Sequence, residues 1–123
     1  GREACDMPSR RWNKPSIMLQ CEANYSNAHG TTWVYKHRQI GKLVGAPVPG
    51  TMTSVNWVRM QDPDLIYGIP VVGYRLPDGS YLENKELEPD VYVLNAPEKV
   101  VKGEDTQLKA AVDELLKELD AKK

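Results

Sequence analysis

A short apolar run, a polar break, a helical pattern and a second short apolar run follow one another within the first 45 residues. The run over 15–21 begins at a proline, and its length is typical of a buried strand in a parallel or mixed sheet. A helix is expected from about Asn27 to Ile40, and Gly41 is well placed to end it in a left-handed conformation. A strand over 42–45 follows directly. Strand, helix and strand with short links form a βαβ-like unit, so this order predicts an α/β or α+β fold.

The expected helix and the later strands have recognisable packing residues. One helix face would carry apolar and aromatic side chains, namely Trp33, Val34, His37 and Ile40. A strand over 53–60 is expected to pack through Val55, Trp57 and Val58. Pro77-Asp78-Gly79 predicts a turn between 69–76 and 81–82, because proline presets φ and glycine accepts positive φ. A further strand is expected over 91–94.

The C-terminal segment has the strongest helical periodicity. Apolar residues recur at helical spacing with charges between them, at Leu108, Ala111, Val112, Leu115, Leu116 and Leu119. Asp105 is the expected N-cap, and Asp113 and Lys117 are an expected i,i+4 ion pair.

Composition narrows the function classes. The 123 residues are 41% hydrophobic and 27% charged with a net charge of -1, which gives no electrostatic case for nucleic acid or an anionic membrane. No run approaches the roughly 20 apolar residues of a membrane span. Neither the cysteines nor His29 and His37 show metal-ligand spacing, so no metal or cofactor is expected. Whether Cys5 and Cys21 pair stays open, as does the choice between a cytoplasmic and a periplasmic location.

Ser26 lies where the first expected strand gives way to the helix. A serine hydroxyl at such a junction can be exposed beside backbone N–H groups that stabilise a developing oxyanion. The simpler interpretation is that its hydroxyl only caps the helix, since serine is among the commonest N-caps. Both interpretations follow from the same local sequence.

Five segments, in order over residues 15–120, resemble the tricorn-like and tail-specific serine peptidases. They are the nucleophile segment Tyr25-Ser26-Asn27-Ala28, the helix end and short strand 40–45, the stretch 70–79, the signature 82–90 and the start of the closing helix, 103–111. The signature reads Leu-Glu-Asn-Lys-Glu-Leu-Glu-Pro-Asp in this chain, where the family has Leu-Glu-x-x-Gly-Val-Glu-Pro-Asp. Glu86 therefore stands where the family has glycine, which suggests a different local turn near Glu83.

The resemblance implies a fold, a reaction and site residues. The fold would be a crotonase-like α/β spiral of strands and helices, with 1–14 as a connecting segment and 15–123 as the C-terminal part of the catalytic domain. Ser26 would be the nucleophile, the Asn27 amide part of the oxyanion hole, and Glu83 the carboxylate that orients the catalytic base. The partners would be a peptide or protein substrate, the remainder of the parent chain and further copies in a homo-oligomer.

The general base is missing from this pattern. Tail-specific members use a lysine near the position of 50–52, where this chain has none, and tricorn-like members use a histidine upstream of the serine, where this chain has none either. His29, where the family usually has an acidic residue, is expected at the surface or rim rather than as the base. The start at Gly1 favours a fragment, which should expose apolar surface.

Two alternatives stay open. One is a catalytically inactive peptide-binding or assembly module with the same fold. The other is an unrelated small ligand-binding domain, which a buried Ser26 would favour.

Overall fold

The expected βαβ unit is present at the start of the described chain. The structure is a computed structural model that describes residues 12–121. Strand β1 (Met18–Gln20), helix α1 (Asn27–His37) and strand β2 (Leu43–Gly45) follow in order, and the two strands pair in parallel. Leu43 and Val44 are completely buried, because β2 lies in the middle of the sheet. The α/β prediction is therefore confirmed.

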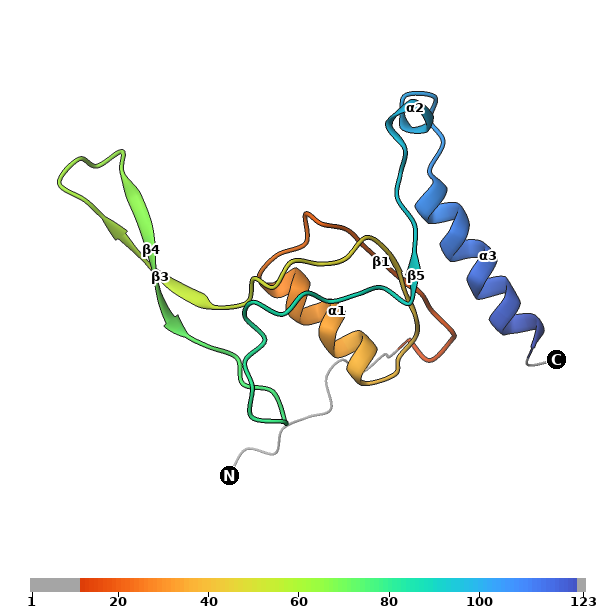
Figure 1. Cartoon of the computed structure of the whole chain (residues 1–123), viewed down its shortest axis with the longest axis horizontal. Coiled ribbons are helices and arrows are strands. Elements are labelled where there is room, and N and C mark those ends of the chain that lie inside the picture. The colour runs from red at the N-terminus through yellow and green to blue at the C-terminus, as the bar shows by residue number, and fades with distance from the viewer. Residues whose placement is uncertain (1–11, 122–123) are drawn as a thin grey trace.

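The sheet gains a third parallel strand and a covering helix. Strand β5 (Val91–Tyr92) pairs with β2, which gives the order β1-β2-β5. The short helix α2 (Pro97–Val100), which the sequence did not predict, leads into α3 (Thr106–Asp120), and α3 contacts β1 and β2 (Figure 1). The segment predicted as a connector, 1–14, lies mostly outside the described residues.

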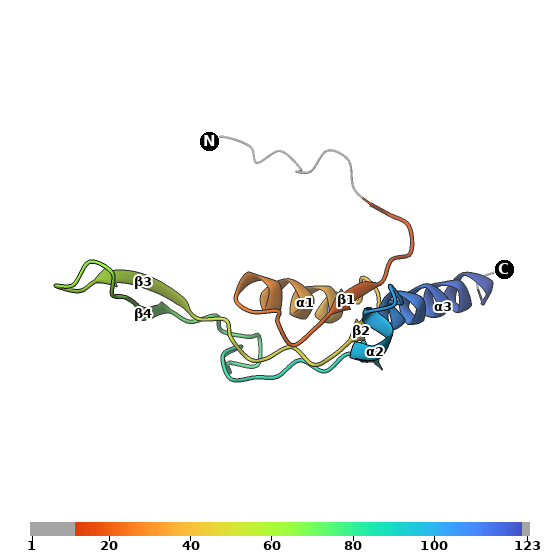
Figure 2. The same cartoon turned by 90° about the horizontal axis from the view of Figure 1, so that it is seen from above.

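A two-stranded arm extends away from this body. Strands β3 (Ser54–Arg59) and β4 (Ile66–Val72) pair with each other, antiparallel, and with no other strand of residues 12–121; they project to one side (Figures 1 and 2). The expected packing role of Trp57 is wrong, because its side chain is 73% exposed on this arm. The turn at Pro77-Asp78-Gly79 is confirmed: Gly79 has φ 86°, and a single bridge joins Arg75 and Tyr81.

Helix α1 ends earlier than expected, and for a different reason. Gln39, not Gly41, has the left-handed conformation (φ 52°), and the Ile40 and Gln39 amides donate to the carbonyls of Tyr35 and Lys36. This is the Schellman hydrogen-bond pattern, so the helix stops before Ile40. Gly41 instead allows its backbone to lie close to that of Ser16, since a Cβ there would lie 2.1 Å from the carbonyl oxygen of Ser16.

The face that α1 buries is also not the predicted one. His29, Thr32 and Tyr35 point into the body, whereas Val34 and Ile40 are exposed. Trp33 stacks on His37 with ring centroids 4.4 Å apart. Helix α1 therefore buries two polar residues, His29 and Thr32, where the sequence pattern predicted an apolar face.

Helix α3 begins as predicted. The Asp105 carboxylate accepts the Leu108 amide at 2.8 Å, as an N-cap does. The predicted pair of Asp113 with Lys117 is wrong: Asp113 pairs with Lys109 at 2.7 Å, and Lys117 lies nearest Glu114. None of the helices within 12–121 is long and apolar enough to cross a membrane.

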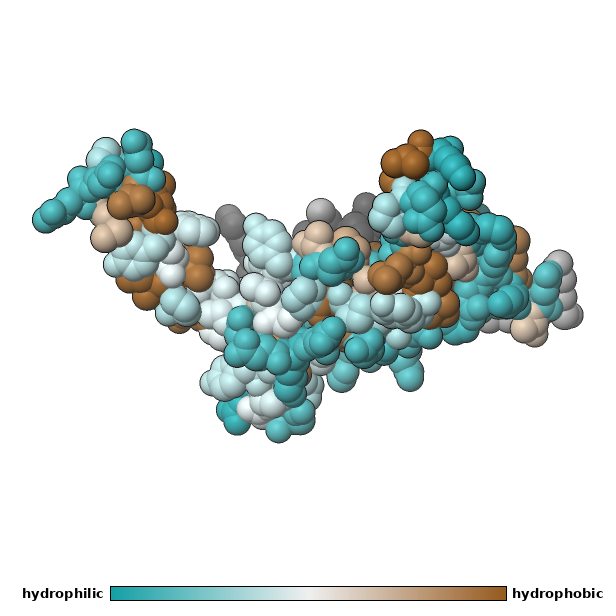
Figure 3. Space-filling model, turned by 45° about the horizontal axis from the view of Figure 1, so that its top comes forward, coloured by the Kyte–Doolittle hydropathy of each residue, from teal (hydrophilic) through white to brown (hydrophobic). Residues whose placement is uncertain are grey.

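Apolar surface is abundant, as expected for part of a larger domain. The buried apolar core is small, whereas many large apolar side chains are exposed, notably along β3, β4 and α3. Figure 3 shows such residues gathered on the arm and beside the end of the sheet. Exposed apolar area of this extent indicates surfaces that other protein covers.

Candidate active site

Ser26 has a strained backbone conformation. Its φ of 53° and ψ of -123°, with the Ala28 amide donating to the Tyr25 carbonyl at 3.0 Å, make it the second residue of a type II′ turn. Glycine dominates that position, because a Cβ is strained there. The Ser26 amide donates to the Thr51 carbonyl at 2.6 Å, which holds the turn from the side.

The hydroxyl of Ser26 does not cap α1. No side-chain cap hydrogen bond is formed at this helix start, so the capping interpretation is wrong. The side chain is partly exposed, which also removes the support that a buried Ser26 would have given to the ligand-binding alternative. A non-glycine residue kept in a strained turn without a capping role points to a function for its side chain.

The backbone beside Ser26 offers hydrogen-bond donors. Asn27 is the first residue of α1, so its amide has no partner within the helix, and no acceptor is found for it among residues 12–121. The N-terminus of an 11-residue helix adds its partial positive charge at the same place. A developing oxyanion next to Ser26 would be stabilised by both.

Glu83 binds the loop at 51–53, and this loop in turn binds the backbone of Ser26. Its Oε2 accepts the Met52 amide (2.6 Å), the Thr53 amide (2.6 Å) and the Thr53 hydroxyl (2.7 Å). The Met52 amide and the Thr53 hydroxyl are the main causes that lower the pKa of Glu83, so the group stays ionised. Because Thr51 precedes this clamp and binds the Ser26 amide, Glu83 fixes the nucleophile turn indirectly. Sequence reasoning missed the three loop residues, since nothing local marks them.

In the turn that contains Glu83, the residue with a positive φ is the one that follows it, Asn84. Asn84 has φ 59°, and its amide donates to the Gly50 carbonyl at 2.7 Å. Asn84 tolerates this conformation better than most residues. Glu86 has no positive φ, so its backbone has no conformation that requires glycine.

His29 is buried beneath the site, not at its rim as expected. Its side chain has 0% exposure, and neither ring nitrogen has a hydrogen-bond partner among the described residues. Burial lowers the pKa of His29, while the Thr51 carbonyl and the Glu83 charge oppose that shift. Without a bond to the Ser26 hydroxyl, His29 is not placed as its base.

We predict that acid destabilises the protein in two windows. His29 has a folded-state pKa below its ordinary 6.5, so the unfolded state binds a proton first and the free energy of unfolding falls as pH drops below about 6.5, by up to about 1.4 kcal/mol per pH unit. The pKa of Glu83 lies below its ordinary 4.5, so its contribution is lost at lower pH still. Urea titrations from pH 8 to 3 measure both slopes.

Two variants test which residue causes the loss of stability in each pH range. His29→Gln should flatten the slope just below pH 6.5. Glu83→Gln should reduce the slope below pH 4.5, to which Asp105 and Glu114 also contribute because their hydrogen bonds lower their pKa values too. An unchanged upper slope in His29→Gln would contradict the assignment to His29.

Lys42, the lysine nearest in sequence to 50–52, is excluded as the base by its contacts. Lys42 pairs with Glu114 and, at 3.3 Å, with Glu118. Its hydrogen bond to Glu114 is the main cause that raises the pKa of Lys42, opposite to what a general base needs. Cys21 donates its thiol to Asn24, and Cys5 lies outside the described residues.

An apolar groove of about 690 Å³ runs along α1 beside this site. Asn27, Gly30 and Val34 form its helix side, and Met52, Arg75 and Leu82 are among the residues opposite. Ser26 does not line it. The groove therefore adjoins the nucleophile turn through Asn27 alone.

Ser26 lies in a strained turn between strand β1 and helix α1. The nucleophile turns of serine hydrolases have this geometry. The family model described as Peptidase family S41 matches residues 2–93. The chain belongs to Peptidase family S41.

Individual relatives agree with this family. A Tricorn-like protease C-terminal subunit of Sulfurisphaera tokodaii is 24% identical over 98% of this chain and 14% of its own length. The crystal structure of the tricorn protease aligns with a TM-score of 0.77 and 24% identity, over 94% of this chain and 12% of that one. This chain thus spans a small part of the relatives that it matches.

Two further solved structures share the fold. A peptidase of Parabacteroides merdae aligns with a TM-score of 0.67 and 22% identity, over 86% of this chain and 33% of that one. Mature CPAF aligns with a TM-score of 0.59 and 23% identity, over 69% of this chain and 16% of that one.

Proposed function

We propose that the chain supplies the nucleophile and part of the oxyanion hole of a serine-type peptidase resembling the tricorn-like and tail-specific enzymes. The observation that carries this proposal is the glycine-like conformation of Ser26, whose hydroxyl makes no capping bond. Family membership supplies the reaction class. In this proposal the Ser26 Oγ attacks the scissile carbonyl, and the Asn27 amide binds the resulting oxyanion.

The base comes from outside residues 12–121 in this proposal. A serine hydroxyl needs a partner that accepts its proton, and neither His29 nor Lys42 has the contacts for it. All three hydrogen bonds to Glu83 use Oε2. Its Oε1 is thereby left to orient the incoming base or the group that holds it.

Substrate would lie along the start of the arm. The loop that Glu83 clamps leads directly into β3, whose edge away from β4 has no strand partner among the described residues. An extended peptide could pair with 52–60 through main-chain hydrogen bonds, as in other strand-addition complexes. The crotonase-like spiral belongs to this proposal too, with β1, α1 and β2 as one of its turns, and so does assembly with the remainder of the domain.

Labelling with a fluorophosphonate tests the nucleophile. The protein at its full natural length is expected to be labelled at Ser26, because an activated serine reacts with this probe. Peptide mapping by mass spectrometry locates the label. Ser26→Ala should lose it, while Ser54→Ala, which removes a nearby hydroxyl bonded to Tyr74, should keep it.

The rival function is an inactive peptide-binding or assembly module with the same fold. A folded full-length protein that takes no label at Ser26, and cleaves no peptide, would establish that module instead.

A further inference from the structure

Helix α3 presents its most apolar side to solvent. The α3 stripe consists of Leu108, Val112, Leu116 and Leu119, whose side chains are 39–53% exposed. These residues recur every three or four positions and so form one continuous row. A row of this kind at the surface of a 15-residue helix requires a partner.

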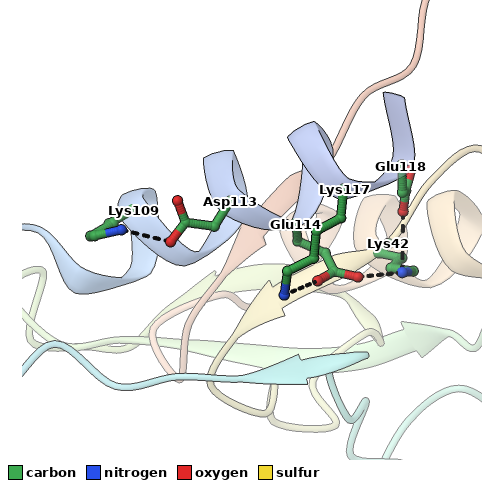
Figure 4. A network of polar contacts seen from close by, with 6 residues as sticks. All are labelled: Lys42, Lys109, Asp113, Glu114, Lys117 and Glu118. Atoms are coloured by element: carbon green, nitrogen blue, oxygen red, sulfur yellow. Dashed lines mark hydrogen bonds and ion pairs between the residues drawn. The ribbon is translucent and has the colours of Figure 1, made fainter. Parts of the chain in front are cut away.

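The stripe faces outward because the other side of α3 is fixed to the sheet. Ala111 is the one buried residue of the helix and allows close approach. Glu114 and Glu118 both point to Lys42, next to β2 (Figure 4). These contacts set the rotation of α3, so the stripe cannot turn inward without breaking two ion pairs.

A row of alternating charge borders the stripe. The α3 charged edge consists of Lys109, Asp113, Lys117 and Asp120, each one position after a stripe residue. Its signs read plus, minus, plus, minus. Read in the opposite direction, the same row is minus, plus, minus, plus, so the edge is complementary to itself only in an antiparallel arrangement.

We propose that the α3 stripe is the contact surface for a second copy of this chain, with the two α3 helices antiparallel about a two-fold axis near Glu114 and Leu115. Lys109 then faces Asp120 of the other copy, and Asp113 faces Lys117. Leu108 meets Leu119, and Val112 meets Leu116. An isologous contact of this kind closes on itself as a dimer.

The ion pair between Lys109 and Asp113 does not oppose this arrangement. Lys109 lies N-terminal to Asp113, which is the weaker orientation for an i,i+4 pair, and both side chains are at least half exposed. Exchanging that pair for one across the interface costs little. One helix face is smaller than a standard interface of roughly 800 Å² per partner, so we expect association in the micromolar range or weaker.

A charge-reversal experiment tests the proposal on the protein at its full natural length. Sedimentation velocity over a concentration series should show self-association of the wild type. Lys109→Glu and Asp120→Lys should each weaken it by about tenfold or more, because each places like charges across the axis twice. An equimolar mixture of the two variants should associate as a heterodimer, which native mass spectrometry identifies by mass, and the double variant should self-associate again. Arg38→Glu, which reverses an exposed charge directly after α1, is the matched control and should change nothing.

Three results would overturn the proposal. The first is a wild type that stays monomeric while hydrogen exchange shows the stripe protected, since another segment of the same polypeptide would then cover it. The second is single variants that associate as tightly as the wild type. The third is folded single variants, verified by circular dichroism, that fail to associate when mixed.

Discussion

Replacing Ser26 by glycine is expected to abolish the proposed peptidase activity and, at the same time, to raise the free energy of unfolding by about 1 kcal/mol. The activity should fall by roughly 10⁴- to 10⁶-fold, as when other serine nucleophiles are removed. Stability should rise because Ser26 has φ 53° and ψ -123°, a conformation that glycine adopts without strain. Urea unfolding and peptide hydrolysis by the protein at its full natural length measure the two effects.

Ser26→Ala is the matched variant, because it removes the hydroxyl but keeps the Cβ. It should lose activity as completely as glycine does, yet gain no stability. Equal stability of the two variants would show that the turn is not strained, and the main structural argument for a functional Ser26 would fail.

Gly45→Ala is expected to cost about 3–5 kcal/mol of folding free energy, enough to unfold a marginally stable domain. Gly45 has φ 136°, and a Cβ there would lie 1.9 Å from the carbonyl oxygen of Gln20. Because Gly45 pairs with Gln20 at the end of β1, the clash would separate β1 from β2 just before the nucleophile turn. Thermal and urea unfolding measure the loss.

Gly103→Ala is the control for that variant. Gly103 also has a positive φ, 78°, but a Cβ there would meet nothing within 4 Å. Its cost should be only about 1 kcal/mol, from backbone strain alone. If both variants lost the same amount, the close approach of β1 to Gly45 would not be the cause.

Local patterns predicted the secondary structure around the site well. Apolar runs of strand length on either side of a helical segment gave β1, α1 and β2, because short links leave few other ways to bury both runs. Asp105 was recognised as the N-cap of α3 because capping depends on residues within one turn. The helix end was misplaced because the left-handed residue is Gln39, and glycine is only the commonest choice there.

Side-chain environments were predicted less well. His29 follows Ser26 by less than one helical turn, and only the packing of α1 over the loop at 51–53 decides that it is buried. The link from Glu83 to Met52 and Thr53 joins segments about thirty residues apart, and no local signal marks the residues that donate to its carboxylate. The roles of Ser26, Asn27 and Glu83 remain predictions, of which the labelling experiment tests that of Ser26.

By itself, the sequence determined the α/β class, the family and the position of the serine at a strand-to-helix junction, since these depend on local periodicity and short motifs. Only the tertiary structure decided the strain at Ser26, the clamp by Glu83 and the outward rotation of the α3 stripe. The physical reason is the same in each case: hydrogen bonds and ion pairs between distant segments, such as Ser26 to Thr51 and Lys42 to Glu118, fix a geometry that either segment alone leaves open.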